Sequence, residues 1–341
     1  MNNRYVLLRS RIFWRILRKG KVSPKKILNA LHCFVAFALR LQRTGKAPFL
    51  VNFELSNECN ANCLFCRSDQ GEIYDQNPLG SGRPIPKGRM PFELYEDLLR
   101  QVQDRLLMAV LYMNGEPLLY KDLSRAVRLA TDLRVATMIS TNGQLLTADR
   151  SREILEAGID FVKVAVSGFT QDVFTRQVRR GNIEKVKENI RDFVRVNRQG
   201  RYGAVLLVDF IEYAYNEHQR AAMREFCDEL GVPLNLRPGN LRGLERDEPQ
   251  RPAPPLPLAV PCDWLWKVLS VHWTGELFPC CDFPLWSGSR PYETFHAGTT
   301  ALAEIWNGPR ARELRRLHAT TGRSTVPVCA VCHRRGTAFK Y

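Results

Sequence analysis

Short apolar runs alternate with amphipathic stretches over residues 49–237. The apolar runs are rich in valine and predict parallel strands that are covered on both faces. They lie at residues 49–54, 106–112, 135–140, 161–166, 204–210 and 234–237. Stretches with helical spacing lie between them, at residues 91–103, 121–131, 147–157, 183–197 and 217–230. Alternating strands and helices joined by right-handed crossovers predict a parallel α/β architecture.

Residues at the ends of these stretches support the same boundaries. Gly158 and Gly231 follow two of the helices, a position where glycine commonly ends a helix. Pro91 and Thr147 stand at the start of two others. About six strand–helix units are too few for a closed eight-fold barrel.

Two segments depart from the alternation. Residues 71–91 are rich in Gly and Pro and predict a long loop, which either covers an active site or is a disordered insertion. Residues 238–261 carry seven prolines and few strand or helix signals, so they predict a linker. A domain boundary is expected there, between residues 49–237 and residues 262–341.

The composition is that of a globular protein in a reducing compartment. The chain has 341 residues, of which 45% are hydrophobic and 25% charged. Its ten cysteines are too few for a disulfide scaffold, and their clustering indicates metal binding. Arginines interrupt the first 20 residues throughout, so no secretory signal is predicted and a cytoplasmic location is expected.

The net charge of +15 is concentrated at the N-terminus. Residues 1–53 hold twelve Lys and Arg and no Asp or Glu, whereas the rest of the chain has 38 basic and 35 acidic residues. Residues 1–48 therefore form a basic amphipathic arm. Its second apolar stretch is interrupted by His32 and Arg40 and is too short to span a membrane.

Two interpretations of this arm stay open. Basic residues beside Trp, Phe and Leu suit a helix in an anionic membrane interface, which would place the protein peripherally at the inner membrane face. The alternative is a helix packed on the barrel with its basic side in solvent. Nucleic acid is not an expected partner, because no nucleic-acid motif accompanies the basic stretch.

The most informative chemistry lies in a cysteine triplet with C-x₃-C-x₂-C spacing, Cys59, Cys63 and Cys66. Structural zinc and ordinary 4Fe–4S sites take four protein ligands, so three thiolates leave one coordination position open. An open position is where a metal site carries out chemistry. A zinc knuckle is the alternative, but no histidine lies within about twenty residues to complete it.

This loop, with Phe65 and the strand before it, resembles the cluster loop of radical S-adenosylmethionine (SAM) enzymes. The resemblance implies a partial (β/α)₆ TIM-like barrel with the loop after its first strand, at the end where barrel enzymes keep their active sites. It implies a 4Fe–4S cluster whose open iron is chelated by SAM. Reductive cleavage of SAM then yields a 5′-deoxyadenosyl radical.

The resemblance also implies residues that bind SAM. Asn114-Gly115-Glu116-Pro117 resembles the family's "GGE" element, with Asn in place of the first Gly. Asn142-Gly143 could equally be only a turn, and Ser167 lacks the usual acidic residue behind it. Arg179 or Arg180 resembles a basic position that pairs with the SAM carboxylate, and the alternative is a solvated surface arginine. The full set is Gly115, Glu116, Pro117, Ser140, Asn142, Ser167 and Arg179.

A second cysteine set lies beyond the linker. Residues 275–282, residues 302–308 and the final C-x₂-C resemble the SPASM module, an auxiliary-cluster domain of radical SAM enzymes. A strand turn at Thr274-Gly275 would bring its first cysteines together. One auxiliary 4Fe–4S cluster is expected, with a zinc ribbon as the alternative. The ligands implied are Cys262, Cys280, Cys329 and Cys332.

The remaining cysteines have simpler interpretations. Cys33 and Cys227 are expected to be plain buried thiols. Cys281 exceeds the ligand count, so it is a candidate hydrogen-atom donor, a spare ligand or a small buried filler. Asp282 beside it is a candidate general base or a residue that orients the loop.

Together these features predict a radical SAM oxidoreductase that abstracts hydrogen from a substrate carbon, in an oxidation, epimerisation or cross-linking reaction. The auxiliary cluster would transfer an electron, and flavodoxin or ferredoxin would be the reductant. The substrate is a small molecule or sugar, a lipid-linked compound or a peptide. The competing class is a non-catalytic, zinc-stabilised basic module that binds membrane or nucleic acid.

Overall fold

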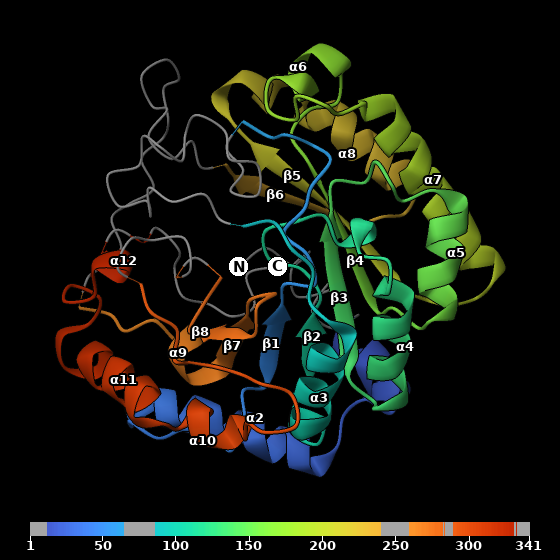
Figure 1. The fold of residues 1–341 in the computed structure, drawn as a ribbon. Helices are drawn as coiled ribbons and strands as arrows, with labels where there is room; N and C mark the ends of the chain where they lie inside the picture. The colour runs from blue at the N-terminus through green and yellow to red at the C-terminus, as the bar shows by residue number, and fades with distance from the viewer. Residues whose placement is uncertain are drawn as a thin grey trace.

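The computed structural model describes residues 12–64, 86–239, 259–281, 283, 289–330 and 332. Its centre is one sheet with the strand order β6-β5-β4-β3-β2-β1-β7-β8-β9 (Figure 1). Strands β1 to β7 run parallel, and β8 and β9 are added antiparallel. The sheet curves without closing, so the predicted partial barrel is confirmed. The strands are β1 Leu50–Phe53, β2 Met108–Val110, β3 Ala136–Thr141, β4 Phe161–Val166, β5 Val205–Glu212, β6 Leu234–Pro238, β7 Val268–Val271, β8 Glu276–Phe278 and β9 Glu293–Thr294.

Helices follow the strands at the expected positions. Residues 12–18 are helical. The short helices α6 and η1 lack a sequence signal, because five and three residues are too few to show a period. Thr147 caps α5 by accepting a hydrogen bond from the Arg150 amide. The remaining elements are α2 Pro24–Ala38, α3 Phe92–Val102, η1 Pro117–Leu119, α4 Leu123–Asp132, α5 Ala148–Glu156, α6 Gln171–Thr175, α7 Ile183–Gln199, η2 Ala214–Gln219, α8 Arg220–Glu229, α9 Trp264–Lys267, α10 Leu302–Trp306, α11 Pro309–Thr321 and α12 Pro327–Ala330.

The two faces of each strand belong to different cores. Val51 and Phe53 of β1 pack outward against the helices, in one cluster with Leu98 of α3. Leu50, on the opposite face, belongs to a second cluster inside the barrel. Because side chains alternate along a strand, the same division holds for β2, β3, β4 and β7. The inner cluster contains Leu50, Met108, Val110, Ala136, Met138, Phe161 and Val268.

The N-terminal helices form the floor of the barrel. Ile16, Ala30 and Cys33 complete the inner apolar cluster from below. Polar side chains tie both helices to the segments that enter the strands: Lys21 Nζ lies 2.6 Å from Asp160 Oδ2, and Asn29 Nδ2 donates to Ala47 O at 2.9 Å. In Figure 1, α2 lies across the lower end of the barrel, beneath β1. Residues 12–48 of the arm are therefore packed on the barrel.

The C-terminal segment is joined to the same sheet. β7 pairs with β1 in parallel, with Val51 opposite Leu269, and β8 returns across the predicted turn at Thr274 and Gly275. Arg315 of α11 is fully buried, and its Nε donates to Leu265 O at 2.7 Å. Residues 65–85 and 240–258, which include most of the predicted Gly- and Pro-rich loop and of the linker, lie outside the described residues.

Candidate active site

The cysteine loop follows β1 at the C-terminal end of the strands, as predicted. Cys59 and Cys63 are half-buried, and Cys66 lies outside the described residues. The backbone of the segment before α7 holds the loop from the far side of the barrel. Cys63 and Val178 form an isolated antiparallel β-bridge, and the Leu64 amide donates to Gln177 O at 2.8 Å. The segment before α7 thus fixes where the two described thiols stand.

Gly115 allows the loop after β2 to approach the cysteine loop closely. A Cβ atom at this position would lie 2.2 Å from the Ser56 carbonyl oxygen, closer than any real contact. The next amide, of Glu116, donates to Glu58 O at 2.8 Å. A side chain at position 115 would therefore push the two loops apart. Pro117 opens η1 directly behind them.

Glu116 links three of the strand-end segments. Its buried carboxylate accepts hydrogen bonds from the Asn142 amide at 2.8 Å and from the Leu118 amide at 3.1 Å. Burial raises the pKa of Glu116 to about 7, although these hydrogen bonds act in the opposite direction. The side chain is a structural tie between loops. The resemblance assigns SAM binding to backbone carbonyls of this element, and that assignment stays a prediction.

Asn142 reaches the cysteine loop itself. Its Nδ2 donates to Asn60 Oδ1 at 2.7 Å and lies 3.9 Å from Cys59 Sγ. Its Oδ1 accepts from the Gln144 amide at 3.0 Å, so the predicted turn is also formed. One residue therefore closes the turn after β3 and contacts the thiol loop.

The other predicted SAM contacts lie around the same opening. Ser140 is half-buried on β3, and Arg179 is exposed beside Val178. Ser167 follows β4 and is fully buried, and its Oγ has no hydrogen-bond partner among the described residues. A buried hydroxyl with an unused donor fits a polar ligand at this strand end.

A ring of polar side chains inside the barrel was missed by the sequence reasoning. Asn52 and Glu54 face the same side as Leu50, above the apolar floor, because side chains alternate along β1. Asn52 Nδ2 donates to Ser270 Oγ at 3.0 Å across β1 and β7. Glu54 Oε2 lies 2.9 Å from His272 Nε2. The signal that could have found them is polar residues at alternate positions of an otherwise apolar strand.

The opposite wall of the barrel carries charged groups. Asp209 of β5 lies between Lys163 Nζ at 3.6 Å and Arg237 Nε at 2.7 Å. Burial opposes ionisation of Asp209, but the two cations hold its pKa below the usual range. The Lys163 ammonium also lies 5.6 Å from the Tyr112 ring centroid. The barrel interior is thus apolar at its floor and charged toward the cysteine loop.

The auxiliary cysteines share one neighbourhood around Tyr292. The buried Tyr292 hydroxyl has no hydrogen-bond partner among the described residues. Burial, with Cys280, Cys329 and Cys262 nearby, raises the pKa of this phenol well above its usual value. Burial raises the pKa of the Cys262 thiol to about 12, and the nearby Cys332 acts in the same direction.

The Tyr292 hydroxyl is an unused donor among thiols, and an iron–sulfur cluster held by these thiols would accept its hydrogen bond. In the described ranges, no three Cys, His, Asp or Glu side chains already stand at metal-ligand spacing. Residue type and this shared neighbourhood are consistent with the four predicted auxiliary ligands, whose assignment stays a prediction. Cys281 is half-buried and packs, with Cys262 and Cys280, against the inner apolar cluster. Asp282 lies outside the described residues.

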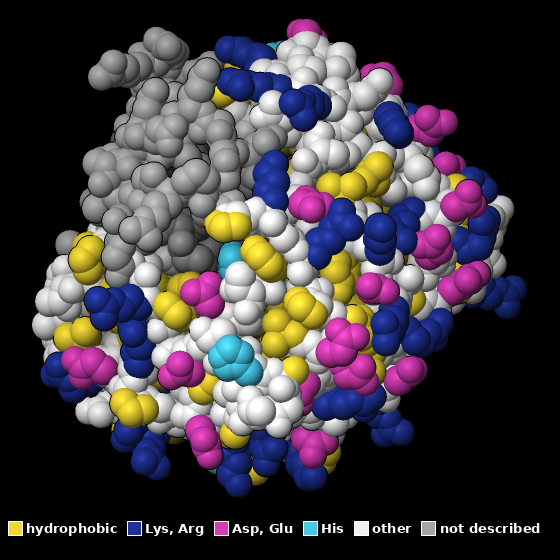
Figure 2. All heavy atoms as spheres, viewed as in Figure 1, with side chains coloured by type: hydrophobic (Ala, Val, Ile, Leu, Met, Phe, Trp, Pro, Cys, Tyr) yellow, Lys and Arg dark blue, Asp and Glu magenta, His cyan; other side chains and the backbone are white. Residues whose placement is uncertain are grey.

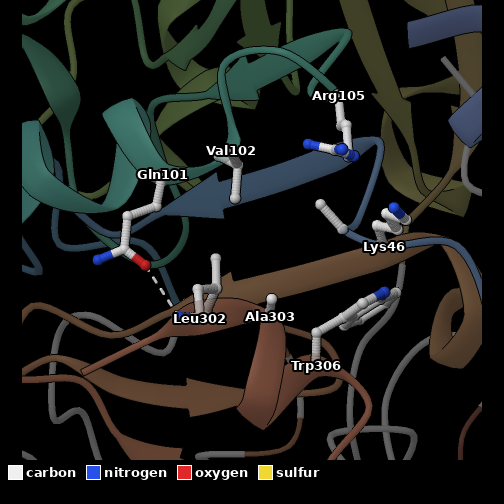
Figure 3. Close-up of a pocket in the computed structure, with 8 residues that line it drawn as sticks. Lys46, Gln101, Val102, Arg105, Leu302, Ala303 and Trp306 are labelled. Atoms are coloured by element: carbon white, nitrogen blue, oxygen red, sulfur yellow. Dashed lines mark hydrogen bonds between the residues drawn. The ribbon is translucent and has the colours of Figure 1, made fainter. Parts of the chain in front are cut away.

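A cavity of about 190 Å³ lies away from this site. It is bounded by Lys46 and Ala47 before β1, by the end of α3 and by α10 (Figure 3). Figure 3 shows Gln101 reaching toward α10, where its Oε1 accepts a hydrogen bond from the Leu302 amide at 2.9 Å. This is a packing defect at the N-terminal end of the strands, on the opposite end from Cys59.

Two family models match the chain. Residues 53–211 match the radical SAM superfamily, and residues 262–333 match SPASM, an iron–sulfur cluster-binding domain. The chain belongs to the radical SAM superfamily and carries a C-terminal SPASM domain. The predicted 4Fe–4S cluster, SAM and auxiliary iron–sulfur site are confirmed at the level of these domains. A non-catalytic zinc module is set aside, and the number of auxiliary clusters stays a prediction.

The chain is similar to curated proteins with different activities. It is 26% identical over 195 residues to a probable GTP 3′,8-cyclase of Methanothermobacter thermautotrophicus, covering 57% of this chain and 58% of that protein. It is 29% identical over 122 residues to an S-adenosylmethionine-dependent nucleotide dehydratase of Lacinutrix mariniflava, covering 36% and 24%. The matches thus span less than two thirds of each of these relatives.

Solved structures share the fold. SuiB of Streptococcus suis aligns with a TM-score of 0.60 at 14% identity, over 81% of this chain and 69% of that one. BtrN, solved with AdoMet and 2-DOIA, aligns with a TM-score of 0.54 at 17% identity, over 86% and 96%. At these identities the likeness concerns the fold alone.

Proposed function

We propose that this protein reductively cleaves SAM and uses the resulting 5′-deoxyadenosyl radical to abstract a hydrogen atom from a carbon of a small polar substrate. Cys59, Cys63 and Cys66 would hold the 4Fe–4S cluster, which when bound supplies the electron that breaks the sulfonium bond. The observation that carries the proposal is the convergence of Gly115, Glu116 and Asn142 on the cysteine loop.

The substrate class rests on the barrel interior. Below the cysteine loop, Asn52, Glu54 and His272 line one wall, and Lys163 and Asp209 line the other. Hydroxyl, amino or phosphate groups could exchange hydrogen bonds with such a lining, whereas an apolar chain would leave its charges without compensation. We therefore favour a hydroxylated or phosphorylated small molecule over a lipid tail inserted into the barrel.

The SPASM side has a separate role. The substrate radical would give up one electron in an oxidation, and the auxiliary cluster would receive it. Tyr292 would orient and tune that cluster through its hydroxyl. If the outcome were epimerisation, the radical would instead take a hydrogen atom, and Cys281 is the candidate donor. Oxidation is favoured, because a complete set of auxiliary thiols is present.

The test is anaerobic incubation of the reconstituted holoprotein with SAM and dithionite, followed by quantitation of 5′-deoxyadenosine. Wild type should produce it, and Cys59→Ala/Cys63→Ala/Cys66→Ala should not. Cys227→Ala is the matched control, since this buried thiol of α8 lies outside the site. Equal amounts of 5′-deoxyadenosine from the triple variant and wild type would refute the assignment.

Substrate class is tested separately. A panel of sugars, polyols and nucleotides is screened for compounds that increase the rate of 5′-deoxyadenosine formation by wild type. Lys163→Met should lose that stimulation while keeping the basal, substrate-free cleavage, because Asp209 keeps its ion pair with Arg237. A stimulating compound that acts equally on Lys163→Met would show that substrate binds elsewhere.

A further inference from the structure

The exposed hydrophobic residues of this protein are gathered on its N-terminal helices. Of the eleven large hydrophobic side chains exposed in the described residues, ten lie between Phe13 and Leu41, and the other is Val260. Trp14, Leu28 and Leu31 are each more than half exposed. Isolated exposed hydrophobics are ordinary, but a gathered set on one surface marks an interaction site. We call this set the floor face: Phe13, Trp14, Leu17, Ile27, Leu28, Leu31, Phe34, Val35, Leu39 and Leu41.

Helix α2 is oriented opposite to an ordinary amphipathic helix. The residues that it buries against the barrel are small or polar: Lys26, Asn29, Ala30, Cys33 and Ala36. The large apolar residues Ile27, Leu28, Leu31 and Val35 follow helical spacing and are exposed on the side away from the barrel. Phe34 lies at the edge of this set, because its ring is partly exposed and also stacks on Phe49. Packing on the barrel therefore does not account for the large apolar residues of α2, whereas contact with a second, external surface would.

The position of the helix is fixed, so the exposed face is not a result of loose docking. Lys26 Nζ donates to Arg134 O at 2.6 Å, and Asn29 Nδ2 donates to Ala47 O. Arg15 and Lys21 form buried ion pairs with Asp160 at 3.2 and 2.6 Å. A rotation of α2 that buried Leu28 and Leu31 would break the contacts of Lys26 and Asn29 and leave their carbonyl partners unpaired.

Charge identifies what covers the floor face. Arg18, Lys19 and Arg43 are exposed beside it, and residues 1–53 contain no acidic side chain. In Figure 2, Lys and Arg side chains lie along the lower rim of the molecule, with some Asp and Glu among them. A second copy of the chain would bring this basic surface against itself. An anionic lipid headgroup layer instead pairs with the cations while its acyl boundary accepts the apolar side chains.

We propose that the floor face is a docking surface for an anionic lipid bilayer, on which the protein lies peripherally. Among the described residues, no helix is both long and apolar enough to cross a bilayer. The apolar side chains would enter the boundary between headgroups and acyl chains, and the basic residues at the rim would contact the headgroups. This proposal is independent of the chemistry at the cysteine loop.

The test is flotation of the full-length holoprotein with phosphatidylcholine vesicles that contain either no anionic lipid or about one third phosphatidylglycerol. Wild type should float with the anionic vesicles only. Leu28→Gln/Leu31→Gln/Val35→Gln should lose at least tenfold in affinity, and Gln keeps helix propensity at these positions. Val260→Gln, at the exposed hydrophobic residue that the described ranges place outside the face, should bind like wild type.

Charge is tested with a matched pair of variants. Arg18→Glu/Lys19→Glu should weaken binding about tenfold or more, since each basic residue near the membrane contributes appreciably. Lys121→Glu/Lys185→Glu changes the net charge equally on exposed positions away from the floor face and should have little effect. Circular dichroism and 5′-deoxyadenosine formation verify that each variant is folded.

Three outcomes would overturn the proposal. Wild type could fail to float with either vesicle at low salt, or the triple Gln variant could bind as tightly as wild type. Light scattering could also reveal a wild-type dimer that the triple Gln variant dissociates, without vesicle binding, and the occupant would then be a second copy of the chain.

Discussion

His272 Nε2 lies 2.9 Å from Glu54 Oε2 inside the barrel. Glu54 stands five positions before Cys59 in the chain. The contact joins β7, from the C-terminal part of the chain, to β1, which leads to the cysteine loop. Asn114 Nδ2 donates to the other oxygen of Glu54 at 2.7 Å. One buried carboxylate therefore aligns the two halves of the protein and the loop after β2.

Replacing Glu54 should destabilise the fold substantially. Glu54→Ala would leave His272 and Asn114 without their partner in a buried position, at a cost of about 3 kcal/mol in the free energy of unfolding. Glu96→Ala, which removes a surface ion pair with Arg100, should cost well under about 1 kcal/mol. Urea unfolding of both variants measures the difference, and equal midpoints would contradict the role of Glu54.

Adding one methyl group at Gly115 should disturb the cysteine loop. Because the new Cβ would overlap the Ser56 carbonyl, Gly115→Ala should lower SAM cleavage at least tenfold and destabilise the fold by about 2 kcal/mol. At Gly298 a Cβ meets nothing within 4 Å, although its φ of 75° favours glycine. Gly298→Ala should therefore cost only about 1 kcal/mol and leave cleavage unchanged. Normal cleavage by Gly115→Ala would show that the loops can separate freely.

Tyr292→Phe should lower the reduction potential of the auxiliary cluster. A hydrogen bond to the cluster stabilises its more negative, reduced form, and a difference of about 1 kcal/mol corresponds to roughly 40 mV for one electron. The measurement is a redox titration followed by electron paramagnetic resonance, in the Cys59→Ala/Cys63→Ala/Cys66→Ala background. Tyr202→Phe, on the far side of the barrel, is the control. An unchanged potential in Tyr292→Phe would mean that its hydroxyl points elsewhere.

Glu116 should make stability fall as the pH rises. Burial raises its pKa from the ordinary value of 4.5 to about 7, so the folded state binds this proton more tightly than the unfolded chain. Its contribution is fully present below pH 4.5 and is lost as the pH rises to about 7, with an upper limit of about 3 kcal/mol. Glu116→Gln cannot titrate, so its denaturation midpoint should change less than that of wild type between pH 5 and pH 8. Parallel pH profiles would contradict the shift.

The fold was predictable where local signals are strong. The valine-rich runs fixed β3 and β4 almost to the residue, and Thr147 marked the start of α5. The cysteine spacing and Gly115-Glu116 predicted the strand ends at which the candidate site lies, and the close approach at Gly115 explains the glycine there. Such features depend on neighbours in sequence, which is why they could be read directly.

Other features depend on partners that are distant in the chain. Val51 pairs with Leu269, and nothing local in either segment specifies that register. The polar lining of the barrel was overlooked because Glu54, Lys163 and Asp209 were counted within apolar strands. For α2, spacing identified the apolar face but not its direction, since Lys26 and Asn29 found buried carbonyl partners.

The location of α2 at the base of the strands separates the proposed bilayer contact from the chemistry at the cysteine loop. Parallel strands of three to eight residues set the barrel height at roughly 10–25 Å, with the thiols at one end and the apolar face of α2 at the other. A molecule bound to a bilayer through α2 would direct the barrel end that carries the cysteine loop toward the aqueous phase. Reactants would then arrive by diffusion from solution, and a compound anchored by a short acyl tail could not reach the radical without first leaving the bilayer.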